Sequence, residues 1–476
     1  MHLFTLLFSN IGNKQEKEYT YIYDILGGKN MEETQKGLMT SGNIWKQLLL
    51  FSIPLVIGNL FQQLYNTVDS IVVGNFIGDN ALAAVNSSGA IVNLLVSFFM
   101  GLSLGAGVVI SNYFGARNED GVHKAIHTSM ALTLASGVIS TLLGVLLTPL
   151  ILEAVNVDPE VMADSVLYLR IYFAGIMGLI IYNMGSGMLR AVGDSKSPLY
   201  FLIVSSITNI VLDLLFVAVF GWGIAGVAIA TLIAQFASAF LTIYKLTHTK
   251  EIYKLTLRKI RFHKETFLKM IKIGLPSAFQ NAIVSLSNVV VQANINSFGK
   301  VAMAGAGSYM KVDGFAILPV MSFSMALTTF VGQNMGAQEY SRVKKGAVAG
   351  IVMSCITSGV ISGLLVIFAP QVMSIFSSNP EVIGIGKLMM YCVVPGYLLL
   401  AVSHCLAGVL RGAGLTKIPM FVMVFCWCIC RVIWITITVS MFHDIRFVFL
   451  GWPVTWVLSA IILTLYYKKA NWLYRY

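Results

Sequence analysis

Acidic residues inside apolar segments are the groups of this sequence that can do chemistry. Of 21 acidic residues in 476, only Asp69, Asp213 and Asp313 fall well inside such a segment. Insertion of a carboxylate into the middle of a membrane-spanning helix costs roughly 2.5 to 3.5 kcal/mol, so acids kept there are functional candidates by default. Asn66 precedes Asp69 by three positions, and Asn209 stands four positions before an acid. Each amide therefore shares a helical face with its acid.

Two of these acids and Thr231 are expected at a similar depth below the outer surface of the membrane. Asp69, Asp213 and Thr231 each lie about four to eight residues from the outer end of their segment, which is roughly 6 to 12 Å. Two carboxylates with amide and hydroxyl oxygens suit a hard cation such as Na+. Because two like charges in a low dielectric also favour protonation of one carboxyl, the same pocket suits a proton. The alternative is separate aspartates, each satisfied by a neighbouring helix.

The segments that must position these groups are membrane spans. The chain is 57% hydrophobic and 11% charged, with a mean hydropathy of +0.79, whereas a soluble domain carries about 25% charged residues. Its apolar runs match the roughly 20 residues that cross a bilayer, which predicts an all-α integral membrane protein. Twelve transmembrane helices are expected, near residues 47–73, 86–111, 124–149, 163–188, 197–219, 223–246, 267–296, 308–333, 343–368, 385–409, 417–441 and 447–467.

An internal repeat predicts the architecture. Residues 189–198 match residues 410–419, and the prolines Pro54 and Pro276 are related by nearly the same offset. Each copy holds six spans, so we expect two six-helix bundles related by a pseudo-two-fold axis along the membrane normal. The expected domains are an N-terminal cytoplasmic segment at 1–45, an N-terminal lobe at 46–247, a basic cytoplasmic linker at 248–266, a C-terminal lobe at 267–468 and a cytoplasmic tail at 469–476.

Basic residues predict the orientation. Twenty Lys and Arg lie in alternate connections and the C-terminal tail, against only Lys300, Lys387 and Arg446 on the opposite side. Positively charged loops stay cytoplasmic, so both termini are expected inside, with the spans in a bacterial inner membrane. The net charge of +11 is spread over segment ends rather than one solvated face, which argues against nucleic-acid binding. The segment 1–30 does not look like a signal peptide, and Met31 is a second candidate for the start.

The connection between the halves carries Lys250, Lys254, Arg258 and Arg261 at three-to-four-residue spacing. This spacing predicts a basic helix on the anionic inner leaflet, with a plain solvated linker as the alternative. The sequence contains no phosphate-binding G-x-x-x-x-G-K-[ST] loop, so energy for transport must come from an ion gradient or a partner. Clustered His, Asp and Glu of an embedded enzyme are absent as well, and no cofactor is implied.

Polar residues of the second half are expected to line a substrate cleft between the bundles: Gln280, Asn281, Gln292, Asp313 and Arg431. Asp313 either attracts a cationic substrate or pairs with Lys311 or Arg431.

The chain resembles the multidrug and toxic compound extrusion (MATE) family of secondary transporters over about residues 40–468. The resemblance is carried by Pro54, residues 65–69, Asn112 with residues 115–117, residues 189–194, Asn209 to Asp213 and residues 230–231, with second-copy echoes at 332–334 and 410–412. It implies export of cationic or amphipathic compounds in exchange for Na+ or H+ by rocking of two lobes. It also implies that Asp69, Asn209 and Asp213 bind the coupling ion, as metal ligands if the ion is Na+, with Thr231 alongside.

The second copy departs from this pattern. At the positions equivalent to Asn209 and Asp213, it has Cys430 and Trp434. Coupling is therefore expected in the N-terminal lobe only, in a monomer embedded in the lipid bilayer. The alternative function is a flippase for lipid-linked sugars. A flippase needs several cations for a pyrophosphate, and only Arg431, with Lys311 and Arg170, qualifies.

Overall fold

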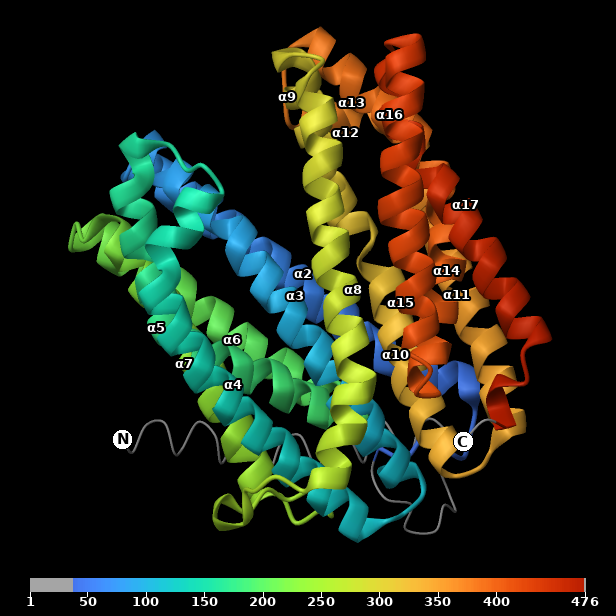
Figure 1. Cartoon of the computed structure of the whole chain (residues 1–476). Helices are drawn as coiled ribbons and strands as arrows, with labels where there is room; N and C mark the ends of the chain where they lie inside the picture. The colour runs from blue at the N-terminus through green and yellow to red at the C-terminus, as the bar shows by residue number, and fades with distance from the viewer. Residues whose placement is uncertain (1–36, 475–476) are drawn as a thin grey trace, which may run out of the picture. The chain divides into compact units, whose positions relative to one another are not determined.

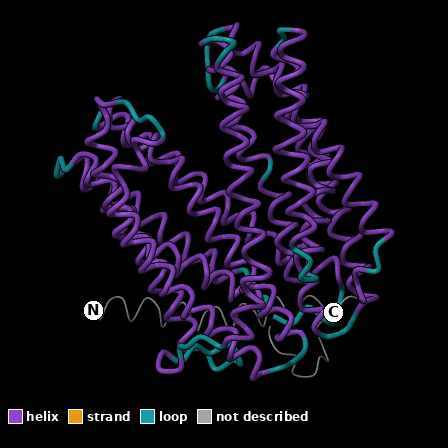
Figure 2. Tube along the Cα trace, in the orientation of Figure 1, coloured by secondary structure: helices purple, strands orange, loops and turns teal. Residues whose placement is uncertain are grey.

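The computed structural model describes residues 37–474, which are helical apart from short turns and one linker, with no strand in this range (Figures 1 and 2). Residues 39–474 belong to one compact unit. The N-terminal stretch with the candidate start at Met31 lies outside the described residues.

The first half holds the helices α2 (Ile44–Phe76), α3 (Asp79–Gly115), α4 (Glu119–Ala154), α5 (Pro159–Ala191), α6 (Lys196–Asp213) with the π-helical η1 (Leu214–Val219), and α7 (Gly223–His248). The second half holds α8 (Lys264–Asn296), α9 (Lys300–Ala316), α10 (Leu318–Gly336), α11 (Tyr340–Ile367), α12 (Ala369–Ser374), α13 (Pro380–Val393), the 3-10 turn η3 (Val394–Gly396), α14 (Tyr397–Gly412), α15 (Lys417–Met423), the π-helical η4 (Val424–Cys430), α16 (Arg431–Phe442), α17 (Ile445–Lys469) and the 3-10 turn η5 (Trp472–Tyr474).

These helices confirm the all-α membrane fold. Counting continuous pairs such as α9 with α10 as one, eleven spans among the described residues are long and apolar enough to cross a membrane. The predicted span at 267–296 is not among these eleven. It corresponds to α8, which is long enough, with 33 residues, but is more polar than the other spans. Its amides, among them Gln280, Asn281 and Gln292, account for the difference.

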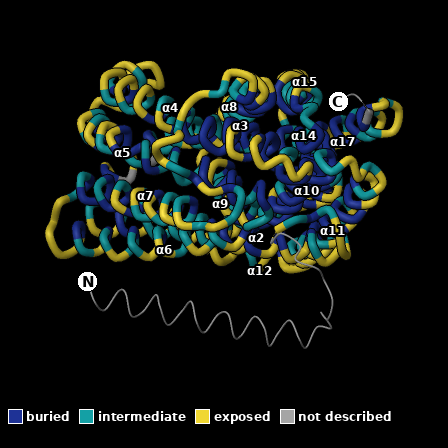
Figure 3. The backbone as a smooth tube through the Cα atoms, turned by 90° about the horizontal axis from the view of Figure 1, so that it is seen from below, coloured by how far each residue is buried: buried dark blue, intermediate teal, exposed yellow. Residues whose placement is uncertain are grey.

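The surface of the helices is what a bilayer requires. Large apolar side chains such as Leu146, Phe240 and Phe421 are more than 60% exposed, and Figure 3 shows exposed positions around the outside and buried ones inside. A water-soluble monomer rarely exposes apolar surface on this scale. The outer helix faces therefore fit contact with lipid.

The turns repeat the two-copy pattern of the sequence. Arg117 and Gln338 follow equivalent helices with φ of 54° and 60°, and Gly193 and Gly414 have φ of 87° and 74°. Both pairs are related by the offset of the internal repeat, so the same left-handed turns end equivalent helices.

The two halves contact each other through their first two spans. The first helix of each copy packs on the second span of the other, α2 on α10 and α8 on α3. A Cβ at Gly105 would overlap the backbone of Gly274, and one at Gly115 would overlap Gln333. The halves therefore meet closely at the end where α3 ends and α8 begins. The predicted lobe boundaries stay predictions, because the compact unit includes both halves.

The connection between the halves is not the predicted basic helix. Residues 249–263 are non-helical except for the 3-10 turn η2 (Leu257–Lys259). The backbone N–H of Thr256 donates to Nε2 of His127 at 3.1 Å, and that of His263 donates to Oγ1 of Thr128 at 3.2 Å. The prediction is wrong because side chains of α4 take backbone donors that a linker helix would need.

Two side chains of the linker are packed into the protein. Tyr253 and Leu255 are buried. Burial and then the nearby Arg261 and Lys124 lower the pKa of His263.

Candidate functional site

Two carboxyl groups from different helices meet inside the first half. Asp69 belongs to α2, and Asp213 is the last residue of α6. Asp213 is fully buried, and the two side chains lie within direct hydrogen-bonding reach of each other. A hydrogen bond between two carboxyls requires a proton on one of them, because an ionised carboxylate only accepts.

Within the described residues, no group donates a hydrogen bond of normal geometry to this pair, and Asn209 is the one amide beside it. Oδ1 of Asp69 and both carboxyl oxygens of Asp213 are buried without a hydrogen-bond partner. Asn209 lies beside Asp213 one turn earlier and is also buried, with both amide atoms unpartnered. Each such atom costs about 1 to 3 kcal/mol, and two like charges in a low dielectric repel. A proton or a cation held by oxygen ligands would remove both costs.

Thr231 and Asn66 differ in how the structure places them. Thr231 is on α7, is 9% exposed and lines the same cavity as Asn209. Asn66 is exposed and is not brought into this group. The helix α6 changes to the π-helix η1 directly after Asp213, and such π-turns often occur where a functional side chain must be re-aimed.

Phenol groups surround the acid pair, and sequence reasoning missed them. Tyr65 and Tyr168 are both close enough to Asp69 to interact electrostatically. Tyr168 stacks on Tyr172, with ring centroids 6.4 Å apart. The i, i+4 spacing of Tyr65 from Asp69 and of Tyr168 from Tyr172 was the available signal.

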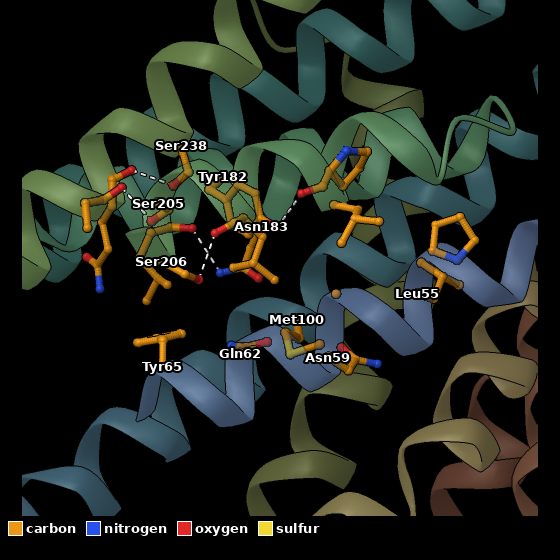
Figure 4. A pocket seen from close by; sticks show the side chains of 18 of the residues that line it. Leu55, Asn59, Gln62, Tyr65, Met100, Tyr182, Asn183, Ser205, Ser206 and Ser238 are labelled. Atoms are coloured by element: carbon orange, nitrogen blue, oxygen red, sulfur yellow. Dashed lines mark hydrogen bonds between the residues drawn. The ribbon is translucent and has the colours of Figure 1, made fainter. Parts of the chain in front are cut away.

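A polar cavity extends from this group between α2, α5, α6 and α7 (Figure 4). In Figure 4, Gln62 and Tyr65 of α2 face Tyr182, Ser205 and Ser206 across it. Its polar lining consists of Asn59, Gln62, Tyr65, Tyr182, Asn183, Arg190, Ser195, Ser205, Ser206, Asn209, Thr231, Gln235 and Ser238. Met100 of α3 and Met325 of α10 add soft apolar surface, which suits varied ligands.

The amides predicted for the substrate cleft do not converge. Gln280 donates to Sδ of Met423 at 2.9 Å within the second half. Asn281 donates to the backbone oxygen of Ser97 at 3.2 Å and so joins α8 to α3. Gln292 instead bonds Asn296 near the end of α8. Gln280 and Asn281 therefore join α8 to neighbouring helices, whereas Gln292 bonds within α8.

The two charged cleft candidates are also separate. Asp313 accepts hydrogen bonds from the hydroxyls of Tyr309, at 3.3 Å, and Tyr397, and no ion pair with Lys311 or Arg431 occurs in the described residues. Arg431 is 2% exposed, and its guanidinium donates to Thr455 and lies over a tryptophan ring. In the described part of the chain, no three His, Cys, Asp or Glu side chains gather as a metal site.

Comparisons with known proteins agree with the two-copy plan of the chain. A family model, MatE, matches residues 54–215 and 276–437, two segments at nearly the offset of the internal repeat. The probable multidrug resistance protein YoeA of Bacillus subtilis (strain 168) is 29% identical over 456 residues, covering 92% of this chain and 97% of that protein. The probable multidrug resistance protein NorM of Thermotoga maritima is 28% identical, with 80% and 82% covered.

The fold also has solved counterparts. A structure described as the outward-facing conformation of a multidrug resistance transporter of the MATE family superposes with a TM-score of 0.86. It is 23% identical and covers 92% of this chain and 98% of its own.

Proposed function

Because the chain belongs to the MatE family of transporters, we propose that it exports cationic or amphipathic compounds by antiport against Na+ or H+. The family and the multidrug resistance relatives establish a multi-pass membrane transporter of small molecules. The antiport proposal is supported chiefly by one observation, the buried pair Asp69 and Asp213 that has no donor from the protein.

The pair explains how an ion gradient would do work. Without an ion, Asp69 and Asp213 repel each other and their helices α2 and α6 are held apart. A proton or Na+, with Asn209 and Thr231 supplying further oxygens, removes that repulsion and favours closer packing. A ligand shifts a two-state equilibrium only by its differential affinity for the states. The pocket must therefore differ between the two orientations of the lobes, which pivot at the contact of α3 with α8.

The setting of this activity follows the charge distribution. The proposed location is a bacterial inner membrane with both termini in the cytoplasm, where the basic connections lie. The proposed working unit is a monomer, since the ion pocket is built by one chain. A flippase for lipid-linked sugars is less well supported, because the described cavity is lined by a single cation, Arg190, and a pyrophosphate requires more.

The test is efflux from proteoliposomes that contain the purified protein. An imposed Na+ or H+ gradient is expected to drive ethidium out, and Asp69→Asn or Asp213→Asn is expected to reduce efflux to the level of protein-free vesicles. Asp120→Asn is the matched control, because this carboxyl is 73% exposed and pairs only with Lys124. Wild-type rates in both pocket variants, or no response of the wild type to either gradient, would contradict the proposal.

A further inference from the structure

The cavity of the first half has one ionised side chain among its lining residues, and that side chain is a cation. Arg190 lies in the last turn of α5 and lines the cavity, whose other lining residues are uncharged. Arginine carries five N–H donors and stays protonated in proteins. A cavity of this kind has positive potential at the Arg190 end, opposite in sign to the acid pair.

Arg190 has no counter-ion. The two ion pairs in the described residues are Lys124 with Asp120 and Arg446 with Asp444. Asp194 is the nearest acid in sequence, and its carboxylate accepts instead from the backbone and hydroxyl of Ser197, at 2.9 and 2.6 Å.

The neutral group nearest to Arg190 is the Tyr182 hydroxyl, which interacts with this guanidinium electrostatically and donates to the backbone oxygen of Pro198 at 3.1 Å. Other polar groups of the cavity lining are also used as donors: Ser205, Ser206 and Asn183 each donate to a backbone oxygen. The guanidinium makes no hydrogen bond to the described residues, so its donors are available to a ligand.

The second copy keeps an arginine at the equivalent place, outside the cavity of the first half. Arg411, which corresponds to Arg190 in the repeat, donates to Sδ of Met423 at 3.7 Å, and its Nε lacks a partner. It is not among the residues that line the first-half cavity. Of the two equivalent arginines, Arg190 is the one that lines the cavity of the first half.

The two charged regions of the first half are spaced for an elongated ligand. Pro198, beside Arg190, and Asn209, beside the acid pair, both line the cavity. They are separated by about 16 Å along α6 at ~1.5 Å per residue. A molecule with an anionic group at one end and a cationic group towards the other matches both.

We propose that Arg190 is an anion subsite that binds the ionised carboxylate of a zwitterionic organic substrate. The planar guanidinium fork can bind a carboxylate through two parallel hydrogen bonds, which selects carboxylates over esters of the same shape. The inference rests on the proposed function only in taking the cavity as the substrate site, and it is tested by binding rather than by efflux.

The test uses two dyes that differ by one methyl group. Rhodamine 110 has a free carboxylate, whereas rhodamine 123 is its methyl ester, and both carry the same cationic ring system. Fluorescence anisotropy with purified protein in detergent is expected to show about 10-fold tighter binding of rhodamine 110. Arg190→Gln is expected to abolish this preference while rhodamine 123 binding is retained, which also shows that the variant is folded. Arg190→Lys should keep part of the preference for rhodamine 110, because lysine retains the positive charge.

The control is Arg258→Gln, which removes an exposed arginine of the linker and should leave both affinities unchanged. Equal binding of the two dyes by the wild type would overturn the proposal. So would an equal loss for both dyes in Arg190→Gln, because that pattern indicates a structural role. Failure of ion-driven efflux with the dye preference intact would overturn the antiport proposal alone.

Discussion

At the scale of single residues, the two halves treat buried carboxyls in opposite ways. Asp313 is held by two tyrosine hydroxyls, so its charge is satisfied by the protein. Asp69 and Asp213 have no such donors. A satisfied carboxylate is a stable structural element, whereas an unsatisfied pair depends on what it binds. This contrast supports coupling in the first half and a structural role for Asp313.

We expect Tyr397→Phe to destabilise the protein by about 1 to 3 kcal/mol, because it removes one of two donors to a largely buried carboxylate. The apparent unfolding temperature in detergent measures the effect. Tyr391→Phe is the control, since this tyrosine of α13 is 44% exposed. A structural role would be refuted by the following result. Both variants unfold at the same temperature, but Tyr397→Phe alone loses efflux.

At the scale of helices, the contact between the halves depends on glycine. Gly105 of α3 and Gly274 of α8 lie with their backbones in contact, and a Cβ at Gly105 would overlap Gly274. Small residues allow helices to approach this closely in membranes. The close approach occurs at one end of both helices, which makes it a suitable pivot for the lobes.

Gly105→Ala is expected to cost about 1 to 3 kcal/mol through overpacking and to slow efflux, because the closed contact can no longer form. Gly89→Ala on the same helix is the control, as a Cβ there meets nothing within 4 Å and should be neutral or stabilising by up to ~1 kcal/mol. Unfolding temperatures and ethidium efflux are compared for both. Similar behaviour of the two variants would show that the contact is not required.

At the scale of the whole molecule, the repeat and the charge asymmetry together predict the topology. Twelve predicted spans would place both termini on one side, and the basic connections predict that this side is the cytoplasm. The turn between α10 and α11 is then expected to face the cytoplasm, and the turn between α12 and α13 to face outward.

This topology predicts the labelling of two matched variants in intact cells. Ser341→Cys replaces an exposed serine in the first turn of α11, and Ser378→Cys replaces an exposed serine between α12 and α13, both in a background without the native cysteines. A membrane-impermeant maleimide should label Ser378→Cys only, and permeabilisation should expose Ser341→Cys. The reverse pattern would show that the orientation is inverted.

Local periodicity determined much of this protein from its sequence. Membrane spans follow from runs of apolar residues, and the two-copy plan follows from the constant offset between matching motifs, because both are properties of contiguous chain. The approach of Asp69 to Asp213 was predictable for the same reason, since helix rise converts position into depth. The proposed roles of these residues remain predictions.

Tertiary structure decided which neighbour each polar side chain meets. Gln280 and Asn281 are adjacent in sequence, yet one bonds within the second half and the other joins α8 to α3. The linker lost its predicted helix to hydrogen bonds with α4. Arg190 shares its motif with Arg411, but of the two only Arg190 lines the cavity of the first half. Spacing along a helix specifies a face, and only the packing of several helices specifies what that face contacts.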